Sequence, residues 1–524
     1  MINRNKKETL FQGALILTLA SLLSKVLSAV YRVPFQNMVG DEGFYIFQQA
    51  YPFYGISMTL SLTAAPLFLS KLMAEHSDDN AKQRYLLQQG QRYLTLLGFV
   101  LFSVLFFGAT VIARLMGDVE LAGIVKVTSV TYLLLPFLGS YRGYYQGLNN
   151  MTPTAISQAI EQLIRVFIII VAAYIGVHVL TISLYRVGEL AMSGAIIGGL
   201  VAAFLLWRFD GKRYPHERVK QQVQLELPSG IWRDMIAVLI TSALLIWFQM
   251  ADAFQVYRLL VEQGMAGEQA KIIKGIYDRG QPLIQLGAVV VTSFSLSIIP
   301  MISQARIRQQ RMTIERLVSF FMRTGIALGV AITAALVMMM PTLNYVLFAD
   351  YEGVSTLRIL VGGLLLLTLL IIVTSVLQGF NIIKAPAMAA ACGIGVKLYL
   401  NHLWIGPYGI SGSAWATNVA LLVSLFISTL ILRRFVSFRV PTWQFVAKLS
   451  VCVMLMLVPL AIIESVPLLQ QHRLLGLLGI LVASSVGAVV FIVAASFWRV
   501  ITPQDIVLLP LGRTLLNYVK KRKR

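Results

Sequence analysis

Long apolar runs alternate with short polar stretches along almost all of the 524 residues. A helix of about 20 apolar residues crosses the hydrocarbon core of a bilayer, which is about 30 Å thick. Runs of this length recur from Leu10 to Trp498, and no polar stretch between them is long enough for a separate soluble domain. The pattern predicts an all-α integral membrane protein with about 14 transmembrane helices.

The predicted helices form two sets of six and a final pair. The first set covers residues 10–33, 44–69, 93–116, 121–148, 154–176 and 189–207. The second set covers 232–260, 275–301, 317–341, 354–380, 386–404 and 411–432, and the pair covers 445–463 and 474–498. We therefore expect an N-terminal six-helix lobe (1–208), a cytoplasmic linker (209–230), a C-terminal six-helix lobe (231–435), and two extra helices with a basic cytoplasmic tail (436–524).

A local repeat relates the two sets of six. The fourth predicted helix ends Gln-Gly-Leu-Asn at 146–149 and is followed by Arg165, while the tenth ends Gln-Gly-Phe-Asn at 378–381 and is followed by Lys397. The base follows the glutamine by the same interval in both, since 165 − 146 and 397 − 378 are both 19. Transporters often pack two such repeats about a pseudo-symmetry axis, with the substrate route between them. We therefore predict two pseudo-symmetric lobes.

Charge is scarce in this chain and unevenly placed. Only 13% of the residues are charged, whereas soluble domains have about 25%. The net charge of +21 comes from basic clusters before residue 8 and at 71–92, 208–220, 306–316, 433–439 and 520–524. Because such clusters mark the cytoplasmic side of membrane proteins, both termini are predicted to be cytoplasmic. Their distribution argues against a nucleic-acid partner.

Charged residues inside the predicted helices are the first candidates for function. Each costs at least about 2.5–3.5 kcal/mol on insertion scales unless it faces protein or a watery cavity. Lys25, Ser28 and Arg32 fall at i, i+3 and i+7 of the first predicted helix, which places them on one face. Two bases on one face favour an anionic ligand. The alternative for Arg32 is that it only reaches to the membrane interface.

A polar stripe marks the fifth predicted helix. Its members are Gln158, Glu161, Gln162 and Arg165, at i, i+3, i+4 and i+7. One face of this helix therefore avoids lipid, either because it lines a route or because an internal pair of Glu161 and Arg165 holds helices together.

Further polar candidates lie in the second set of helices. They are Gln249 and Asp252 in the seventh helix, Asp278 and Arg279 in the eighth, and Lys397 in the eleventh. For Asp278 and Arg279 the alternative is a solvated helix start, because they lie near the predicted outer end. Asp252 and Lys397 are deeper in their helices.

The sequence contains no pattern for catalysis or for a bound cofactor. No phosphate-binding Gly-Lys loop follows a strand, and the five histidines lack acidic or nucleophilic partners at motif spacing. Cys392 and Cys452 lie in apolar helices without metal-ligand spacing, so neither a disulfide nor a metal site is implied. We expect a protein that is not an enzyme, uses no cofactor and does not pump with ATP by itself.

Two stretches carry a resemblance to a known family. One contains LSKVL at 23–27, YRVP at 31–34 and AYPFY at 50–54, and the other contains RGYYQG at 142–147 followed by Pro153 and the polar stripe up to Arg165. In this order they resemble the MurJ/SpoVB branch, and particularly the YtgP-like proteins, of the multidrug/oligosaccharidyl-lipid/polysaccharide (MOP) exporter superfamily. With the six-plus-six-plus-two arrangement, the resemblance covers nearly the whole chain.

The resemblance implies a lipid II flippase, which carries an undecaprenyl-diphosphate-linked disaccharide-pentapeptide to the outer leaflet for peptidoglycan synthesis. Members have a central cavity between two lobes, and the bases that bind the diphosphate there fall on Lys25, Arg32 and Arg279. Lysine replaces the usual arginine at Lys25, and Arg32 aligns only with a one-residue shift. An acidic residue and a base expected in the second helix fall on Gly43 and Ile56.

Some members of the family bind sodium with carboxylates of the seventh, eleventh and twelfth helices. Here Asp252 supplies one carboxylate, but the eleventh helix has Lys397. A lysine ammonium can balance a buried carboxylate permanently. We therefore expect Lys397 to be the counter-ion of Asp252 and transport to be independent of sodium.

The resemblance also implies the bacterial plasma membrane as location, a lipid-linked glycan and membrane lipid as partners, and cell-wall synthesis enzymes as further partners. Another undecaprenyl-linked glycan would share the anionic anchor, so it stays open as a substrate. A multidrug or cation antiporter of the same superfamily predicts an acidic cavity, which the bases of the first helix oppose. A non-transporting scaffold would not need the polar stripes.

Overall fold

The structure, a computed structural model, describes residues 4–76, 79–213, 230–295, 297–438, 442–466 and 472–500. All regular elements in these ranges are helices, which confirms the predicted all-α class. Most of the predicted linker, residues 214–229, and the predicted basic tail from residue 501 lie outside the described residues. The chain forms two compact units.

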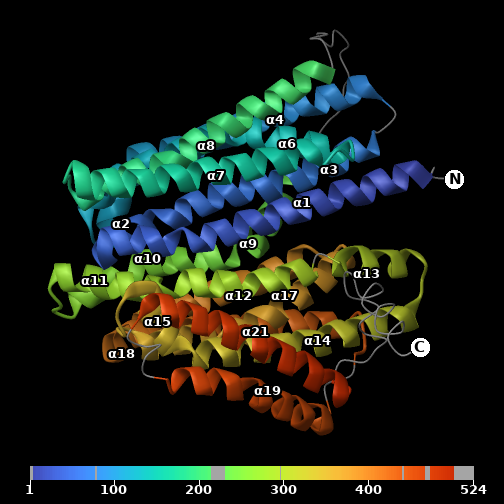
Figure 1. Ribbon diagram of the computed structural model, residues 1–524. Helices are drawn as coiled ribbons and strands as arrows, with labels where there is room; N and C mark the ends of the chain where they lie inside the picture. Colours follow the sequence, from blue (N-terminus) through green and yellow to red (C-terminus); the bar gives the residue numbers. More distant parts are fainter. Residues whose placement is uncertain are drawn as a thin grey trace. The chain divides into compact units, whose positions relative to one another are not determined.

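The first unit comprises Met1–Asp278 and Leu398–Gly409. Its elements are α1 (Arg4–Val30), α2 (Arg32–Thr59), η1 (Leu60–Ala64), α3 (Ala65–Glu75), α4 (Asn80–Met116), η2 (Val119–Leu121), α5 (Ala122–Ser129), η3 (Val130–Leu134), α6 (Leu135–Gly147), α7 (Thr152–Tyr174), η4 (Ile175–Val179), α8 (Leu184–Arg213), α9 (Ile231–Ser242), α10 (Leu244–Glu262) and α11 (Gly267–Asp278). Figure 1 shows α1, α7 and α8 as long helices that pack side by side.

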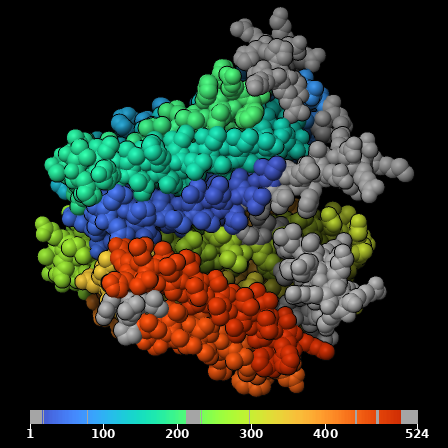
Figure 2. Space-filling model, viewed as in Figure 1, coloured from blue at the N-terminus to red at the C-terminus, as the bar shows by residue number. Residues whose placement is uncertain are grey.

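The second unit comprises Arg279–Lys397 and Ile410–Arg524. Its elements are α12 (Gly280–Ser295), α13 (Ile298–Ile307), α14 (Arg311–Met338), α15 (Met340–Phe348), α16 (Val354–Gly362), α17 (Leu364–Gly379), α19 (Trp443–Glu464) and α21 (Arg473–Phe497). Helix α18 (Lys384–Arg433) gives its central residues to the first unit and its ends to the second. The orange to red helices α19 and α21 lie side by side and pack against each other (Figure 2). Helix α14 packs against α19, and α15 packs against α21. The predicted bounds of the two lobes stay predictions.

Eleven helical segments of the described residues are long and apolar enough to cross a membrane. Two of them, Leu19–Glu75 with 57 residues and Lys384–Arg433 with 50, exceed twice the about 20 residues that one crossing needs. Each contains one glycine with positive φ, Gly40 at 70° and Gly409 at 56°, where the helical conformation is interrupted. A left-handed glycine ends a helix without steric cost. Both segments are therefore suited to cross twice, and the predicted number of fourteen crossings stays a prediction.

Two predicted helices are broken in the structure. The predicted eighth helix, 275–301, corresponds to α11, α12 and α13, with breaks after Asp278 and Ser295. The predicted seventh helix, 232–260, is divided at Ala243, whose φ of −101° and ψ of 19° are not helical. Apolar residues surround the break at Ala243, whereas the break after Asp278 falls in the polar stretch Asp-Arg-Gly-Gln-Pro at 278–282. Hydropathy averaged over a whole crossing did not resolve either interruption.

Helix α4 begins well before the predicted start at residue 93. Asp79 is extended, and its carboxylate accepts a hydrogen bond from the backbone N–H of Lys82 at 3.0 Å, which caps the helix. This bond lowers the pKa of Asp79, which precedes the membrane-spanning part of α4. In the first turns of α4, Arg84 pairs with Asp210 of α8 at 2.8 Å. The polar start of α4 is therefore tied to the end of α8.

The local repeat of the sequence adopts one conformation in both copies. Asn149 and Asn381 are both left-handed, with φ of 57° and 62°. The backbone N–H of each asparagine donates to the backbone carbonyl of the glutamine three residues before it, at 3.0 and 2.8 Å. The backbone N–H of the residue that follows the asparagine donates to the carbonyl five residues before it, at 2.9 Å in both copies. These are the two bonds of a Schellman helix end. The two sequence copies are thus the same local structure.

The glycine in each copy is needed for close packing. A Cβ at Gly147 would lie 2.3 Å from Met73 Cβ on α3, and a Cβ at Gly379 would lie 2.8 Å from Ile302 Cβ on α13. Both distances are far below ordinary van der Waals contact. Each copy therefore fixes how one helix end packs on its neighbour.

We expect Gly147→Ala and Gly379→Ala each to destabilise the protein by about 1–3 kcal/mol, because the added methyl forces the neighbouring helix to move. Gly395→Ala is the matched control, since this glycine lies in α18 with nothing within 4 Å of its Cβ position. Alanine there is favoured by up to about 1 kcal/mol. Thermal unfolding in detergent would measure all three, and equal unfolding temperatures would contradict the packing role.

Candidate functional site

Arg32 is fully buried in the first unit. Its side chain is 0% exposed, and its guanidinium carbon lies 4.2 Å from the centre of the Tyr51 ring. Among the described residues, no group accepts a hydrogen bond from its Nε, Nη1 or Nη2. An interfacial anchor keeps its charge in water, so the buried guanidinium does not fit that alternative.

Lys25 and Ser28 follow the same helical path as Arg32. Tyr31, between α1 and α2, has helical φ and ψ of −62° and −23°, so the helix direction continues from Lys25 to Arg32. Ser28 is buried like Arg32, whereas Lys25 is exposed. The predicted face therefore has a buried part and one base at the surface.

The predicted polar stripe of α7 faces α1. Ser21 Oγ donates to Gln158 Oε1 at 3.3 Å, and Arg165 Nη2 donates to Ser28 Oγ at 3.3 Å. Both pairs are 137 residues apart, which shows that α1 and α7 run parallel. Figure 2 shows the blue surface of α1 directly beside the blue-green surface of α7. The stripe thus lies between two helices and is withdrawn from lipid.

Arg165 is the second base in this region. It is 2% exposed, and its guanidinium carbon lies 4.7 Å from the centre of the Tyr54 ring and 5.6 Å from that of Tyr31. Its Nε has no partner in the described residues. The rings of Tyr51 and Tyr54 lie 6.0 Å apart. Tyr31, Tyr51 and Tyr54 therefore form an aromatic wall against which the guanidiniums of Arg32 and Arg165 both lie.

Glu161 pairs with a base of another helix and not with Arg165. Its Oε2 accepts a hydrogen bond from Arg142 Nη2 of α6 at 2.5 Å, and Arg142 Nε donates to Ser157 Oγ at 3.3 Å. The expected alternative of an internal pair in α7 is therefore wrong. Arg142 was missed as a site residue, although a base inside the predicted fourth helix was an available signal.

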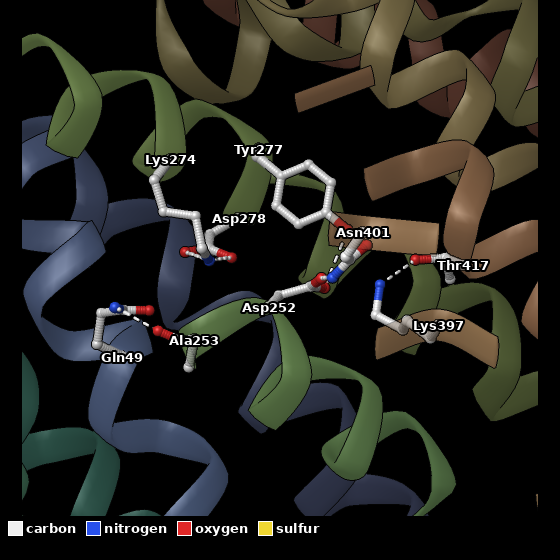
Figure 3. A network of polar contacts seen from close by, with 9 residues as sticks. All are labelled: Gln49, Asp252, Ala253, Lys274, Tyr277, Asp278, Lys397, Asn401 and Thr417. Carbon is white, nitrogen blue, oxygen red and sulfur yellow. Dashed lines mark hydrogen bonds and ion pairs between the residues drawn. The ribbon is translucent and has the colours of Figure 1, made fainter. Parts of the chain in front are cut away.

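Asp252 is buried among neutral donors of the first unit. Tyr277 Oη donates to its Oδ2 at 3.0 Å and Asn401 Nδ2 donates to its Oδ1 at 3.1 Å (Figure 3). Gln249, three residues earlier on α10, is also buried. In the second unit, Lys397 is buried and its ammonium donates to Thr417 Oγ1 at 2.6 Å. The predicted ion pair between Asp252 and Lys397 stays a prediction.

Asp278 is buried, which does not fit a solvated helix start. Both of its carboxylate oxygens accept hydrogen bonds from Lys274 Nζ, at 2.6 and 2.7 Å (Figure 3). The two residues are four apart on α11, a spacing that places them on one helical face. Lys274 was missed because the predicted helix began one residue after it.

Arg279 is held by a carboxylate in the second unit. Its Nη1 and Nη2 donate to Asp350 Oδ1 and Oδ2 at 2.6 and 2.8 Å, and its guanidinium carbon lies 5.0 Å from the centre of the Phe348 ring. The Arg279 side chain is 1% exposed, whereas that of Asp350 is 35% exposed. The donor edge of Arg279 is thus engaged by a protein carboxylate.

No group of three or more His, Cys, Asp and Glu side chains in the described ranges could hold a metal ion. Cys392 and Cys452 are free cysteines. The buried polar groups of the two units are instead arranged as single ion pairs, hydrogen bonds and guanidiniums stacked on aromatic rings.

Comparison with known proteins gives these sites a family context. Residues 10–306 match the family model described as polysaccharide biosynthesis protein. The uncharacterized membrane protein YabM of Bacillus subtilis (strain 168) is 34% identical over 534 aligned residues, which cover 99% of this chain and 98% of that protein. The chain belongs to the polysaccharide biosynthesis protein family.

Other members and structures of known proteins extend this family relation. The lipid II flippase MurJ of Bacillus subtilis (strain 168) is 23% identical over 457 residues, 81% of this chain and 82% of that protein. A solved structure of lipid II flippase MurJ in an inward closed conformation matches with a TM-score of 0.68 over 93% of this chain and 99% of that chain, at 14% identity. The resemblance to the MOP exporter superfamily is confirmed, and the family member described here is a multi-pass membrane protein with that fold.

Proposed function

We propose that this protein is a flippase that moves the undecaprenyl-diphosphate-linked peptidoglycan precursor, lipid II, from the inner to the outer leaflet by alternating access. The observation that carries the proposal is the buried guanidinium of Arg32, which has no acceptor in the described residues. A buried charge without a partner costs several kcal/mol. A protein of a polysaccharide biosynthesis family that retains such a charge is suited to bind an anionic substrate group.

The three bases Lys25, Arg32 and Arg279 are proposed to bind the diphosphate. A guanidinium presents a planar fork of N–H donors that matches phosphate oxygens. Lys25 is exposed, so it would attract the anion before the buried bases do. Arg279 becomes available only when Asp350 releases its donor edge.

The membrane potential can give this transport its direction. When the membrane potential is negative on the cytoplasmic side, outward movement of the diphosphate is favourable by about 2.3 kcal/mol per charge per 100 mV. The prenyl tail stays in lipid throughout, so only the headgroup needs a polar route. The proposed protein therefore needs no nucleotide, and it would lie in the bacterial plasma membrane with both termini cytoplasmic.

A flippase for another undecaprenyl-linked polysaccharide precursor is the second candidate. One observation favours it: residues 10–306 match a family model that is described by polysaccharide biosynthesis in general and not by lipid II. Such a substrate would use the same diphosphate and differ only in its glycan. A drug or cation antiporter is less compatible, because the buried Arg32 and Arg165 would repel a cation.

In bacteria depleted of their own lipid II flippases, expression of this protein is expected to restore lipid II on the outer leaflet, whereas Arg32→Ala restores none although it inserts normally. The reason is that the variant lacks the charge that binds the diphosphate. Arg311→Ala is the control, since Arg311 is an exposed base. Absence of outer-leaflet lipid II with the parent protein would refute the lipid II assignment, and full activity of Arg32→Ala would refute the role of the base.

A further inference from the structure

The buried bases of the first unit fall into two kinds. Arg142 and Lys274 each have a carboxylate partner, at 2.5 and 2.6 Å. Arg32 and Arg165 are as deeply buried, yet neither has a carboxylate partner among the described residues. Two buried guanidiniums of this unit therefore have no hydrogen-bonded carboxylate among the described residues.

The buried carboxylates of the same unit are already engaged. Glu161 and Asp278 are bound by the two paired bases, and Asp252 accepts from Tyr277 and Asn401. Asp118 accepts from Tyr45 and Tyr185, and Asp210 pairs with Arg84. Small side-chain movements would therefore not satisfy Arg32 and Arg165 without breaking another bond. The donors of these two bases that have no acceptor in the described part of the unit are therefore suited to an anion that comes from outside it.

The tyrosine contacts of Arg32 and Arg165 cover the faces of their guanidiniums. At the edges, Arg165 Nη2 donates to Ser28 Oγ, whereas Arg165 Nε and all three guanidinium nitrogens of Arg32 have no acceptor among the described residues. Arg32 lies over Tyr51 at 4.2 Å, and Arg165 lies over Tyr54 at 4.7 Å. A ring attracts a cation through its π-face, whereas the N–H donors of a guanidinium point outward in its own plane. Stacking on the aromatic wall thus holds each base in place without using the donors that bind an oxyanion.

The neighbouring polar atoms add donors. Tyr31 Oη, Ser24 Oγ and Gln162 Nε2 are buried and have no partner in the described residues. Ser24, Ser28 and Tyr31 follow one face of the α1 path at i, i+4 and i+7, and Gln162 lies three residues before Arg165 on α7. Between α1 and α7 there is therefore a layer of hydrogen-bond donors next to Arg165.

We infer that Arg165 and Arg32 form a two-base site for a diphosphate, with one guanidinium for each phosphate. The identity of this ligand rests on the proposed function. A diphosphate offers two phosphoryl groups, so it can use both forks at once, whereas a monophosphate can use one. Because both side chains are buried, the site fills only when the surface around it opens, as alternating access provides.

The inference adds Arg165 of the first unit to the bases that are proposed to bind the diphosphate. Lys25 then attracts the substrate, and Arg32 with Arg165 holds it. Arg165, which the family resemblance does not place among the diphosphate-binding bases, becomes a substrate-binding residue, and Ser28 positions it through the 3.3 Å hydrogen bond.

Binding to the full-length protein in detergent tests the site, with farnesyl diphosphate, farnesyl monophosphate and inorganic pyrophosphate as probes. We expect farnesyl diphosphate to bind about tenfold more tightly than the monophosphate, since it engages a second guanidinium fork. Arg165→Met is expected to weaken diphosphate binding about tenfold and to remove the preference over monophosphate. Arg165→Lys, which keeps the charge but not the fork, should fall between them.

Unfolding temperature without ligand separates a binding role from a structural one. Removal of an unbalanced buried charge stabilises the empty protein, so Arg165→Met should unfold at a higher temperature than the parent while it binds diphosphate less. Arg84→Gln is the matched control: Arg84 also lies over a tyrosine ring, that of Tyr144, but pairs with Asp210. It should leave diphosphate affinity unchanged.

Two results would overturn the inference: Arg165→Met with unchanged diphosphate affinity, or a parent that binds monophosphate as tightly as diphosphate. Pyrophosphate that binds as tightly as farnesyl diphosphate would overturn the lipid-linked source. Transport of lipid II in vesicles is scored separately. If the parent binds diphosphate through Arg165 but moves no lipid II, the proposed function fails and the site stands. If the parent moves lipid II and Arg165→Met binds and transports equally, the site fails and the function stands.

Discussion

Glu161→Gln is expected to lower the free energy of unfolding by about 3–5 kcal/mol, because it leaves the Arg142 guanidinium buried without its carboxylate. The Arg142 side chain is 0% exposed, so water cannot solvate the guanidinium in place of the lost carboxylate charge. Arg142→Met should be similarly costly, since it leaves the Glu161 carboxylate alone. The double variant should recover most of the loss, because neither charge then remains buried.

A double-mutant cycle read by reversible unfolding would measure this coupling. The control is the pair Arg258 and Glu262 on α10, whose side chains are 47% and 53% exposed. Glu262→Gln should cost less than about 1 kcal/mol, as exposed pairs do. The interpretation of Arg142 and Glu161 as a buried structural pair is wrong if Glu161→Gln costs no more than Glu262→Gln.

Arg279→Ala and Asp350→Asn are expected to act in opposite directions on transport. If Arg279 binds the diphosphate, its loss should reduce transport at least about 30-fold, which corresponds to about 2 kcal/mol for a charged hydrogen-bonded partner. Asp350→Asn removes the carboxylate that engages Nη1 and Nη2. The freed guanidinium should then bind diphosphate more tightly than in the parent.

Transport and diphosphate affinity of both variants would separate two roles of this pair. If Arg279 only anchors the loop that contains Asp350, both variants should lose transport to a similar degree. Asp234→Asn, a change of the same kind near the start of α9, is the control for loss of one carboxylate. A parent-like Arg279→Ala would remove Arg279 from the set of substrate-binding bases.

Hydropathy predicted the helices well because a bilayer demands about 20 apolar residues for each crossing. It did not predict the breaks at Ala243 and Arg279, because hydropathy is averaged over a whole crossing. At Arg279 the polar residues 278–281 and Pro282 were an available signal for the break. The spacing of polar residues along one helix was likewise informative about that helix alone. The stripe on α7 showed which residues avoid lipid, but the partner of Glu161 came from α6, and spacing within one helix carries no information about a neighbouring helix.

The local repeat predicted backbone structure but not side-chain contacts. The matching Gln-Gly-x-Asn ends correctly indicated equal backbone structure, because a left-handed asparagine and a close-packed glycine have few substitutes. The bases that follow the two glutamines by 19 residues differ in their contacts. Arg165 lies over the Tyr54 ring, whereas Lys397 donates to Thr417. Side-chain chemistry after the turn is set by local neighbours, which the repeat does not specify.

The contacts between α1 and α7 have a consequence for the synthesis and membrane insertion of the protein. Ser28 and Arg165 are 137 residues apart, and ribosomes add about 5–20 residues per second, so α1 waits roughly 7–27 s for its partner. Until then its serines would face hydrocarbon, where unmet polar groups are costly. We expect α1 to stay beside the insertion machinery, or against α2, until α7 has been made. During this interval the incomplete chain should be most susceptible to proteolytic quality control.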